Sequence, residues 1–193
     1  MRKSSNKEKL LETGLRVIHQ HGFMNASVRD IVEAAGVPQG SFTNHFSSKE
    51  EFCLEVLDSY HENALKVIRD TLRNDSVAPM KRLSDYIDAR ANFLKVVGAE
   101  NGCLYGNVTA ELNEHSENVR RRIGEMFGEV RAAIAYCLKA AVKAGDLPKT
   151  TKCDDIADFI LSSMQGAMLL GRGQRNLTPL RHFKDILFSK VLR

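Results

Sequence analysis

The 193-residue chain has room for one large domain or two smaller ones, and its formal net charge is +4. A hydrophobic content of 43% supports a packed core, while 7% aromatic residues and no long β-branched alternation favour helices over a sheet. No stretch approaches about 18 apolar residues, so we expect no membrane span. The N-terminus has no apolar run after its charges, so we expect a cytoplasmic protein without a secretory signal.

An N-terminal helix and a helix-turn-helix are predicted for the first quarter of the chain. Apolar residues at helical spacing predict a helix over residues 5–21, and Gly22 supplies its stop. Ser27 is a predicted N-cap, Asp30 occupies the capping-box position three residues later, and Gly36 ends this second helix.

A third, short helix is predicted over residues 39–45, directly after Pro38. Phe42 and Phe46 lie four residues apart and share its inward face, which leaves polar side chains facing outward. Two short helices joined by a tight turn, with a polar face on the second, are typical of a DNA reader. Residues 1–49 also hold +3 of the net charge, a modest footprint for binding a polyanion.

Six further helices are predicted after this region, and the whole chain is therefore expected to be all-α with about nine helices. A bend is expected at residues 113–116, and the glycines near residue 171 are expected to end one of the helices. The predicted ranges are about 48–72, 80–97, 103–112, 117–144, 153–170 and from Thr178 close to the C-terminus.

The motifs between residues 8 and 56 resemble the tetracycline-repressor-like family of bacterial transcriptional regulators. This resemblance implies a DNA-binding domain over residues 1–49 and an effector-binding and dimerisation domain over residues 50–193. It also implies a homodimer built on the last two long helices and a small-molecule cavity in each subunit. The matching residues are Gly22-Phe23, Ala34-Ala35-Gly36-Val37, Gly40-Ser41-Phe42, His45-Phe46 and Lys49-Glu50.

The chain departs from the family pattern in the third helix. The family usually carries Tyr where this chain has Thr43, and often Lys where it has Gln39. Glutamine and asparagine can pair with adenine, and threonine can touch a thymine methyl group, so a polar reading face is retained. The alternative is that these side chains are only a solvated helix face. The expected DNA-binding residues are Ser27, Arg29, Gln39, Gly40, Ser41, Thr43, Asn44, His45 and Lys49, of which Ser27, Arg29, His45 and Lys49 would contact phosphates.

Two apolar helices near the C-terminus are expected to form a twofold dimer. Such a dimer has two DNA-binding domains, which we call reading heads, and they can bind the two halves of a palindromic operator. The same apolar stripe could instead belong to the core of one subunit. The expected interface consists of Ile156, Phe159, Ile160, Ser163, Ala167, Leu170, Phe183, Ile186 and Leu187.

An effector would act by preferring the conformation that binds DNA poorly, and it would then release a repressor from its operator. Each candidate pocket residue has the alternative of being an ordinary core residue. The candidates are Tyr86, Phe93, Leu94, Cys103, Tyr105, Asn107, Phe127, Tyr136, Gln165 and Met168.

Cys103 also carries a separate hypothesis. It follows a glycine at a predicted helix start, where the helix dipole would lower the pKa of a thiol. The segment Gly102-Cys103-Leu104 resembles one branch of the family, some members of which respond to electrophiles or oxidants. The alternative is that Cys103 is a small buried apolar residue.

Other classes of protein find little support in the motifs. The four cysteines form no C-x-x-C pair, so we expect no zinc site, and no cofactor motif is present. The chain has no H-E-x-x-H, no G-x-S-x-G and no glycine-rich phosphate loop. An enzyme or a helical adaptor without DNA binding remains the alternative to a regulator, which we expect to be a repressor rather than an activator.

Overall fold

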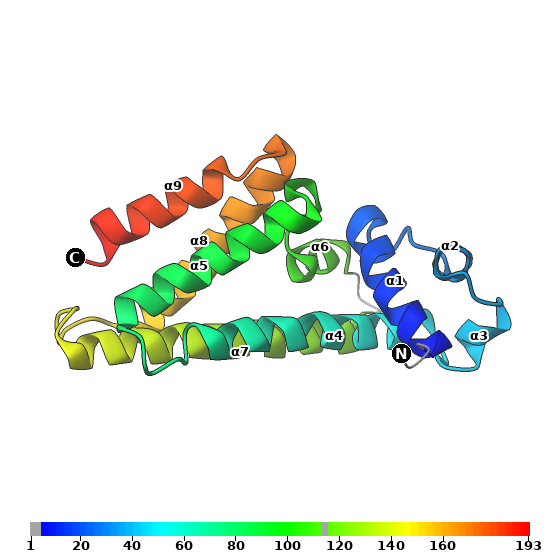
Figure 1. Cartoon of the computed structure of the whole chain (residues 1–193), viewed down its shortest axis with the longest axis horizontal. Coiled ribbons are helices and arrows are strands. Elements are labelled where there is room, and N and C mark those ends of the chain that lie inside the picture. Colours follow the sequence, from blue (N-terminus) through cyan, green and yellow to red (C-terminus); the bar gives the residue numbers. More distant parts are fainter. Residues whose placement is uncertain (1–4, 113–115) are drawn as a thin grey trace. The chain divides into compact units, whose positions relative to one another are not determined.

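The computed structural model describes residues 5–112 and 116–193, and these residues form nine α-helices (Figure 1). The predicted all-α class is therefore confirmed. No helix of the described ranges is both long and apolar enough to cross a membrane. The helices are α1 Asn6–His21, α2 Val28–Ala35, α3 Gly40–Thr43, α4 Lys49–Asp70, α5 Pro79–Val97, α6 Leu104–Glu111, α7 Glu117–Ala144, α8 Cys153–Gln174 and α9 Thr178–Ile186.

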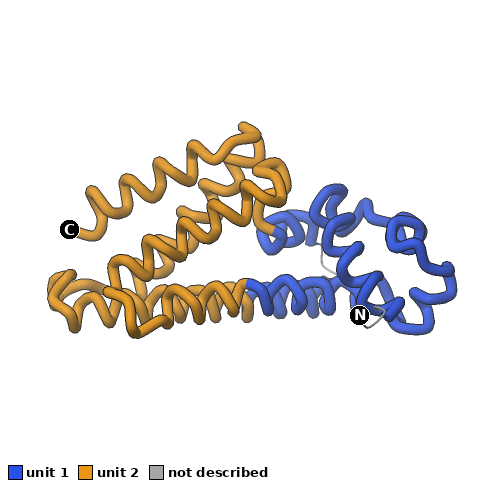
Figure 2. The backbone as a smooth tube through the Cα atoms, viewed as in Figure 1, with its two compact units in different colours: residues 1–63, 104–124 blue, residues 64–103, 125–193 orange. Residues whose placement is uncertain are grey.

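The chain divides into two compact units (Figure 2). The first comprises residues 1–63 and 104–124, and the second comprises residues 64–103 and 125–193. The continuous helices α4 and α7 contribute residues to both units. These units are defined by contacts between residues of the folded chain. The predicted boundary after residue 49 instead separates DNA binding from effector binding and dimerisation, and it stays a prediction.

Aromatic packing forms the core of the first unit around α3. The rings of Phe42 and Phe46 lie 5.2 Å apart, and Phe52 of α4 lies 5.1 Å from Phe42 and 4.9 Å from Phe46. Gly14 of α1 faces this cluster so closely that an added Cβ would lie 2.2 Å from the Phe52 ring. The glycine therefore allows α1 to approach the cluster.

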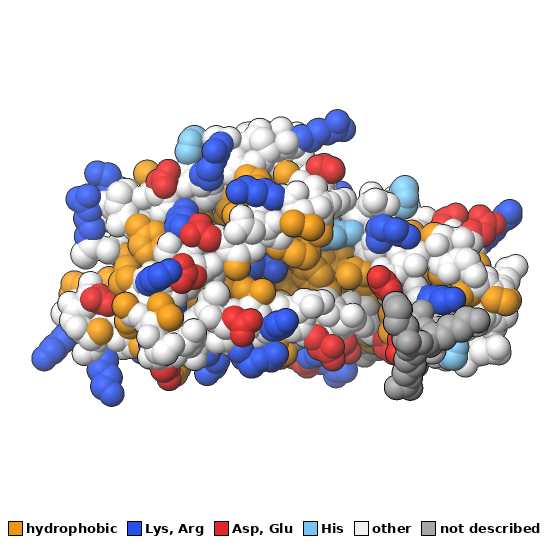
Figure 3. Space-filling view, viewed as in Figure 1, with side chains coloured by type: hydrophobic (Ala, Val, Ile, Leu, Met, Phe, Trp, Pro, Cys, Tyr) orange, Lys and Arg blue, Asp and Glu red, His pale blue; other side chains and the backbone are white. Residues whose placement is uncertain are grey.

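The second unit combines an apolar core with ion pairs on its surface. Ile87, Ile134 and Met164 are at most 1% exposed and come from α5, α7 and α8. Arg131 of α7 pairs with Asp158 of α8 at 2.5 Å, and the side chain of Asp158 is half exposed. Acidic and basic side chains are interspersed over the face of the molecule drawn in Figure 3.

One predicted helix end was wrong. The glycines after residue 170 do not break α8, which continues to Gln174. Arg175 ends it in the left-handed conformation with φ 53°, and the N–H of Asn176 then bonds to the carbonyl of Gly171. An added Cβ on Gly171 would lie 2.8 Å from the Asn176 carbonyl oxygen, so this glycine makes room for the closing turn. The predicted bend begins at residues 113–115, which lie outside the described residues.

Candidate nucleic-acid interface

Local hydrogen bonds fix both ends of α2. The Ser27 hydroxyl accepts from the N–H of Asp30 at 3.1 Å, and the Asp30 carboxylate accepts from the N–H of Ser27 at 3.0 Å. These bonds confirm the predicted capping box. The Ser27 hydroxyl also donates to the Asp30 carboxylate at 2.6 Å, and this bond, followed by the one from the Ser27 N–H, holds the pKa of Asp30 below its usual value. Gly36 closes the helix with φ 61°, and the N–H of Val37 returns to the Val32 carbonyl at 3.2 Å. The turn into α3 is therefore tight.

The segment of residues 39–45, which consists of α3 and the residues that flank it, carries a row of exposed polar side chains and is anchored from inside. Phe42 and Phe46 are at most 3% exposed and hold the helix from inside. The exposed residues of this segment are Gln39, Gly40, Thr43, Asn44 and His45. A helix this short is not stable by helix propensity alone, so the packing of the aromatic cluster stabilises it.

Ser41 lies apart from this row. It is 7% exposed, and its hydroxyl accepts a hydrogen bond of 3.1 Å from the side-chain amide of Asn6 in α1. The pattern of polar residues did not identify Asn6, because its contact with Ser41 spans 35 residues of sequence. In this structure the bond between Asn6 and Ser41 therefore connects α1 to α3. The expected contact of Ser41 with DNA stays a prediction.

The residues expected at phosphates have different surroundings. Ser27 and Arg29 are exposed, and Arg29 pairs with Glu33 one turn later at 2.8 Å. The ammonium group of Lys49, by contrast, donates to the carbonyl of Met24 at 3.0 Å. The backbone N–H of Met24 bonds to Glu111 of α6 at 2.8 Å, a partner that no sequence motif indicated.

The residues expected to line an effector pocket fall into different environments. Tyr105 and Asn107 belong to the first unit, where the Tyr105 hydroxyl lies 2.7 Å from Nδ1 of His61. Phe93, Phe127 and Gln165 are half-buried in the second unit. The buried candidates of the second unit are Tyr86, Leu94, Cys103 and Met168.

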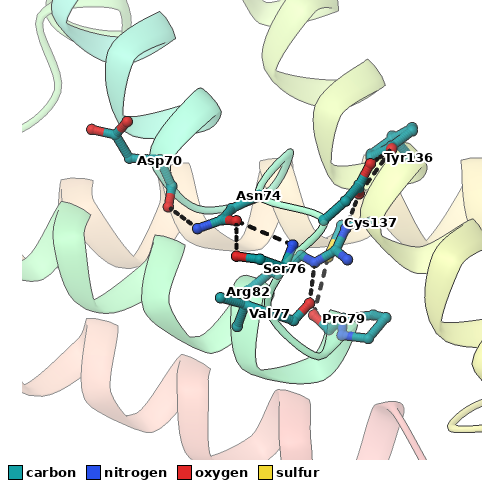
Figure 4. A network of polar contacts seen from close by, with 9 residues as sticks. Asp70, Asn74, Ser76, Val77, Pro79, Arg82, Tyr136 and Cys137 are labelled. Carbon is teal, nitrogen blue, oxygen red and sulfur yellow. Dashed lines mark hydrogen bonds and ion pairs between the residues drawn. The ribbon is translucent and has the colours of Figure 1, made fainter.

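Tyr136 is the exception among these candidates, because it is 37% exposed. Its hydroxyl donates to the Asp75 carboxylate at 2.8 Å, and the Arg73 guanidinium lies 4.9 Å from its ring centroid. Figure 4 shows how this tyrosine joins the network around the α4–α5 connection, in which buried Arg82 bonds to Asp75 and to the Val77 carbonyl. Tyr136 therefore contacts the α4–α5 connection at the surface of the protein.

A groove of about 640 Å³ runs between α8 and α9. Among the residues expected in the dimer interface, Ile160 is fully buried within the subunit and Ile156 is half-buried. The groove is lined by Phe159, Ser163, Gly166, Ala167, Leu170, Gln174, Thr178, Pro179, His182, Phe183, Ile186 and Leu187, which include the other seven expected interface residues.

The four cysteines are all free and buried. Burial raises the pKa of Cys53 to about 12 and that of Cys137 to about 11. These two thiols are therefore poor nucleophiles at neutral pH. Cys103 is 5% exposed and directly precedes α6.

Two family models match this chain. The model of bacterial regulatory proteins of the tetR family matches residues 10–56, which contain the helix-turn-helix. The model of the tetracyclin repressor-like C-terminal domain matches residues 79–187.

Similar proteins extend over nearly the whole chain. The transcriptional repressor DhaR of Mycobacterium sp. strain GP1 is 34% identical over 192 residues, which cover 100% of this chain and 95% of DhaR. A regulatory protein TetR from Rhodobacter sphaeroides superposes with a TM-score of 0.89 at 24% identity, covering 94% of this chain and 96% of that one. A cysteine mutant of the regulator CifR, complexed with 26-bp operator DNA, has a TM-score of 0.83 at 18% identity, covering 98% of both chains.

Proposed function

Because this chain belongs to the tetR family of bacterial regulatory proteins, we propose that it is a transcriptional repressor that places α3 in the major groove of operator DNA. The exposed polar row on the anchored α3 is the observation that carries this proposal. Two similar proteins support the same role, because DhaR is a transcriptional repressor and CifR forms a complex with operator DNA.

The contacts with DNA divide by chemistry. Gln39 and Asn44 can each pair bidentately with an adenine, and the methyl group of Thr43 can touch a thymine. Ser27, Arg29 and His45 are exposed on the same segment and are suited to phosphate oxygens. Gly40 has open space where a Cβ would stand, which allows a close approach of the DNA backbone.

Dimerisation would supply the second reading head. We assign the interface to the α8–α9 groove, where Phe159, Leu170 and Ile186 are between 45% and 59% exposed. Large apolar side chains grouped in one groove are typical of a surface that a partner covers. A second copy with the same groove would give the twofold symmetry of a palindromic operator.

Release from the operator would follow from effector binding in the C-terminal domain. Candidates for contact with a small apolar molecule in the second unit are Phe93, Phe127, Gln165 and Met168. A ligand that prefers the conformation with misplaced reading heads lowers operator affinity by its differential affinity for the two conformations.

Retention of genomic DNA fragments by the purified protein tests the repressor proposal. Bound fragments should share a palindrome, and their affinity should fall steeply with salt concentration. A screen of small molecules on the recovered fragment should then identify an effector by release. Absence of retention on every fragment at low salt would exclude this function.

A second candidate function is release through alkylation or oxidation of Cys103. Its position directly before α6, after Gly102 with φ 63°, favours this idea. The raised pKa values of Cys53 and Cys137 also favour it, because they make those two thiols poorer candidates for the reaction. The test compares operator release by an alkylating agent in the wild type and in Cys103→Ser. Unchanged release in the variant excludes the sensor role.

A further inference from the structure

Residues 22–27 form the turn that connects α1 to α2, and the position of this turn sets where α2 lies relative to α1. Gly22 ends α1 with φ 84°, a conformation that favours glycine, and its N–H bonds to the Ile18 carbonyl at 2.9 Å. Met24 lies three residues before Ser27, the N-cap of α2. A displacement of Met24 therefore moves the start of the helix-turn-helix.

Glu111 reaches this turn from the end of α6. Its carboxylate accepts the N–H of Met24 at 2.8 Å, and an added Cβ on Gly22 would lie 2.4 Å from its other oxygen. An acidic residue at the C-terminus of a helix is disfavoured by the helix dipole. The contact with the turn is the interaction that offsets this unfavourable position.

Lys49 reaches the same turn from the first residue of α4. Its ammonium group donates to the Met24 carbonyl at 3.0 Å and lies 4.9 Å from the centroid of the Phe23 ring. The side chain is half-buried, and this burial lowers the pKa of Lys49, while the charges of Glu111 and Asp30 act in the opposite direction. Both backbone polar groups of Met24 are thus bound by side chains from other helices.

We propose that Lys49 and Glu111 form a clamp on the α1–α2 turn and are positioning residues for operator binding. The proposal rests on the repressor function stated above. Through the clamp, α4 and α6 fix the start of α2, and with it the direction in which α3 presents its polar row. Lys49 then contributes to affinity from inside the protein rather than as a phosphate contact.

The salt dependence of operator binding separates these two roles. A lysine that contacts a phosphate releases a counterion, so its removal reduces the slope of log K against log salt by about 0.9. Removal of a positioning lysine weakens binding at every salt concentration and leaves that slope unchanged. For Glu111 the two roles differ in sign, because loss of an acid near DNA by charge alone strengthens binding.

The experiment measures affinity and salt slope for the full-length wild type, Lys49→Met, Glu111→Ala and Glu111→Gln on a duplex selected from a random pool. We expect Lys49→Met and Glu111→Ala each to weaken binding roughly three- to tenfold at an unchanged slope. Glu111→Gln keeps an acceptor oxygen for Met24 and should recover most of the affinity. Glu12→Ala removes an exposed acid of α1 and serves as the matched charge control.

Amide hydrogen exchange of Met24 provides a second readout. Exchange should be faster in Glu111→Ala than in Glu111→Gln. This comparison does not require DNA, so it tests the clamp even if the protein binds no duplex. Absence of duplex binding would exclude the repressor function and not the clamp. If Lys49→Met or Glu111→Ala does not fold, Glu111→Gln, which keeps the acceptor oxygen but loses the charge, should still show faster Met24 exchange than the wild type. A reduced slope in Lys49→Met, tighter binding by Glu111→Ala, or unchanged affinity and Met24 exchange in all variants would overturn the clamp.

Discussion

Gly14 shows how a single missing side chain positions α1 against the reading helix. In an exposed helix, Gly→Ala stabilises by about 1 kcal/mol because alanine has the higher helix propensity. At Gly14 the new Cβ would lie 2.2 Å from the Phe52 ring, and Phe42 and Phe46 prevent that ring from moving. Gly14→Ala should therefore lower the free energy of unfolding by about 1–3 kcal/mol.

Chemical denaturation of Gly14→Ala and of a control measures this effect. Gly124 of α7 is exposed and has open space at its Cβ position, so Gly124→Ala should stabilise the protein slightly. A stable Gly14→Ala variant would show that the aromatic cluster does not restrain α1.

Asp75 predicts a pH dependence at the α4–α5 connection. The Tyr136 hydroxyl, followed by Arg82, holds the pKa of Asp75 below its usual value. A lowered pKa stabilises the folded state above the unfolded pKa, which is about 4, and this stabilisation is lost as pH falls through the lower folded value. Asp75→Asn should therefore reduce stability at pH 7 and have little effect near pH 2.

Tyr136→Phe removes the hydroxyl that has the largest influence on Asp75 and should reduce the same pH dependence. Thermal unfolding between pH 2 and pH 7 measures both variants. Equal loss of stability in Asp75→Asn at both ends of this range would contradict the assignment.

Individual helices could be predicted wherever the determining signal was local. The capping box at Ser27 and the paired Phe42 and Phe46 predicted α2 and the buried face of α3, and α7 has the predicted bounds. The end of α8 was missed because a glycine permits a helix stop without requiring one. Here the following turn, which needs the space at Gly171, places the stop at Arg175.

The prediction of the site from sequence missed the contacts between residues that are far apart in the chain. Polarity alone could not show that Ser41 is held by Asn6 or that Lys49 is held by Met24. It likewise gave no sign of Glu111, which lies 87 residues from Met24. Periodicity distinguishes the inside of a helix from its outside, but it does not identify which neighbour covers each face.

The assembly of the whole molecule can be tested in the α8–α9 groove. Leu170 is 59% exposed in this groove, so Leu170→Glu would place a charge in the proposed interface. We expect a monomer in sedimentation and much weaker operator binding, because one head contacts only half of the palindrome. The control is Val96→Glu on α5, where the side chain is 86% exposed, and it should leave the assembly unchanged. A dimer in Leu170→Glu would place the interface elsewhere.

The central claim is that α3 reads the operator through its exposed polar row. Its most direct test is the ratio of affinities for the selected operator and a scrambled duplex, measured at one salt concentration for the wild type, Asn44→Ala and Asn63→Ala. The control residue, Asn63, is exposed on α4. Asn44→Ala should lose about 1–3 kcal/mol of affinity for the operator and almost none for the scrambled duplex, while Asn63→Ala should match the wild type. An unchanged ratio for Asn44→Ala, together with unchanged ratios for Gln39→Ala and Thr43→Ala, would contradict the assignment of α3 as the reading helix.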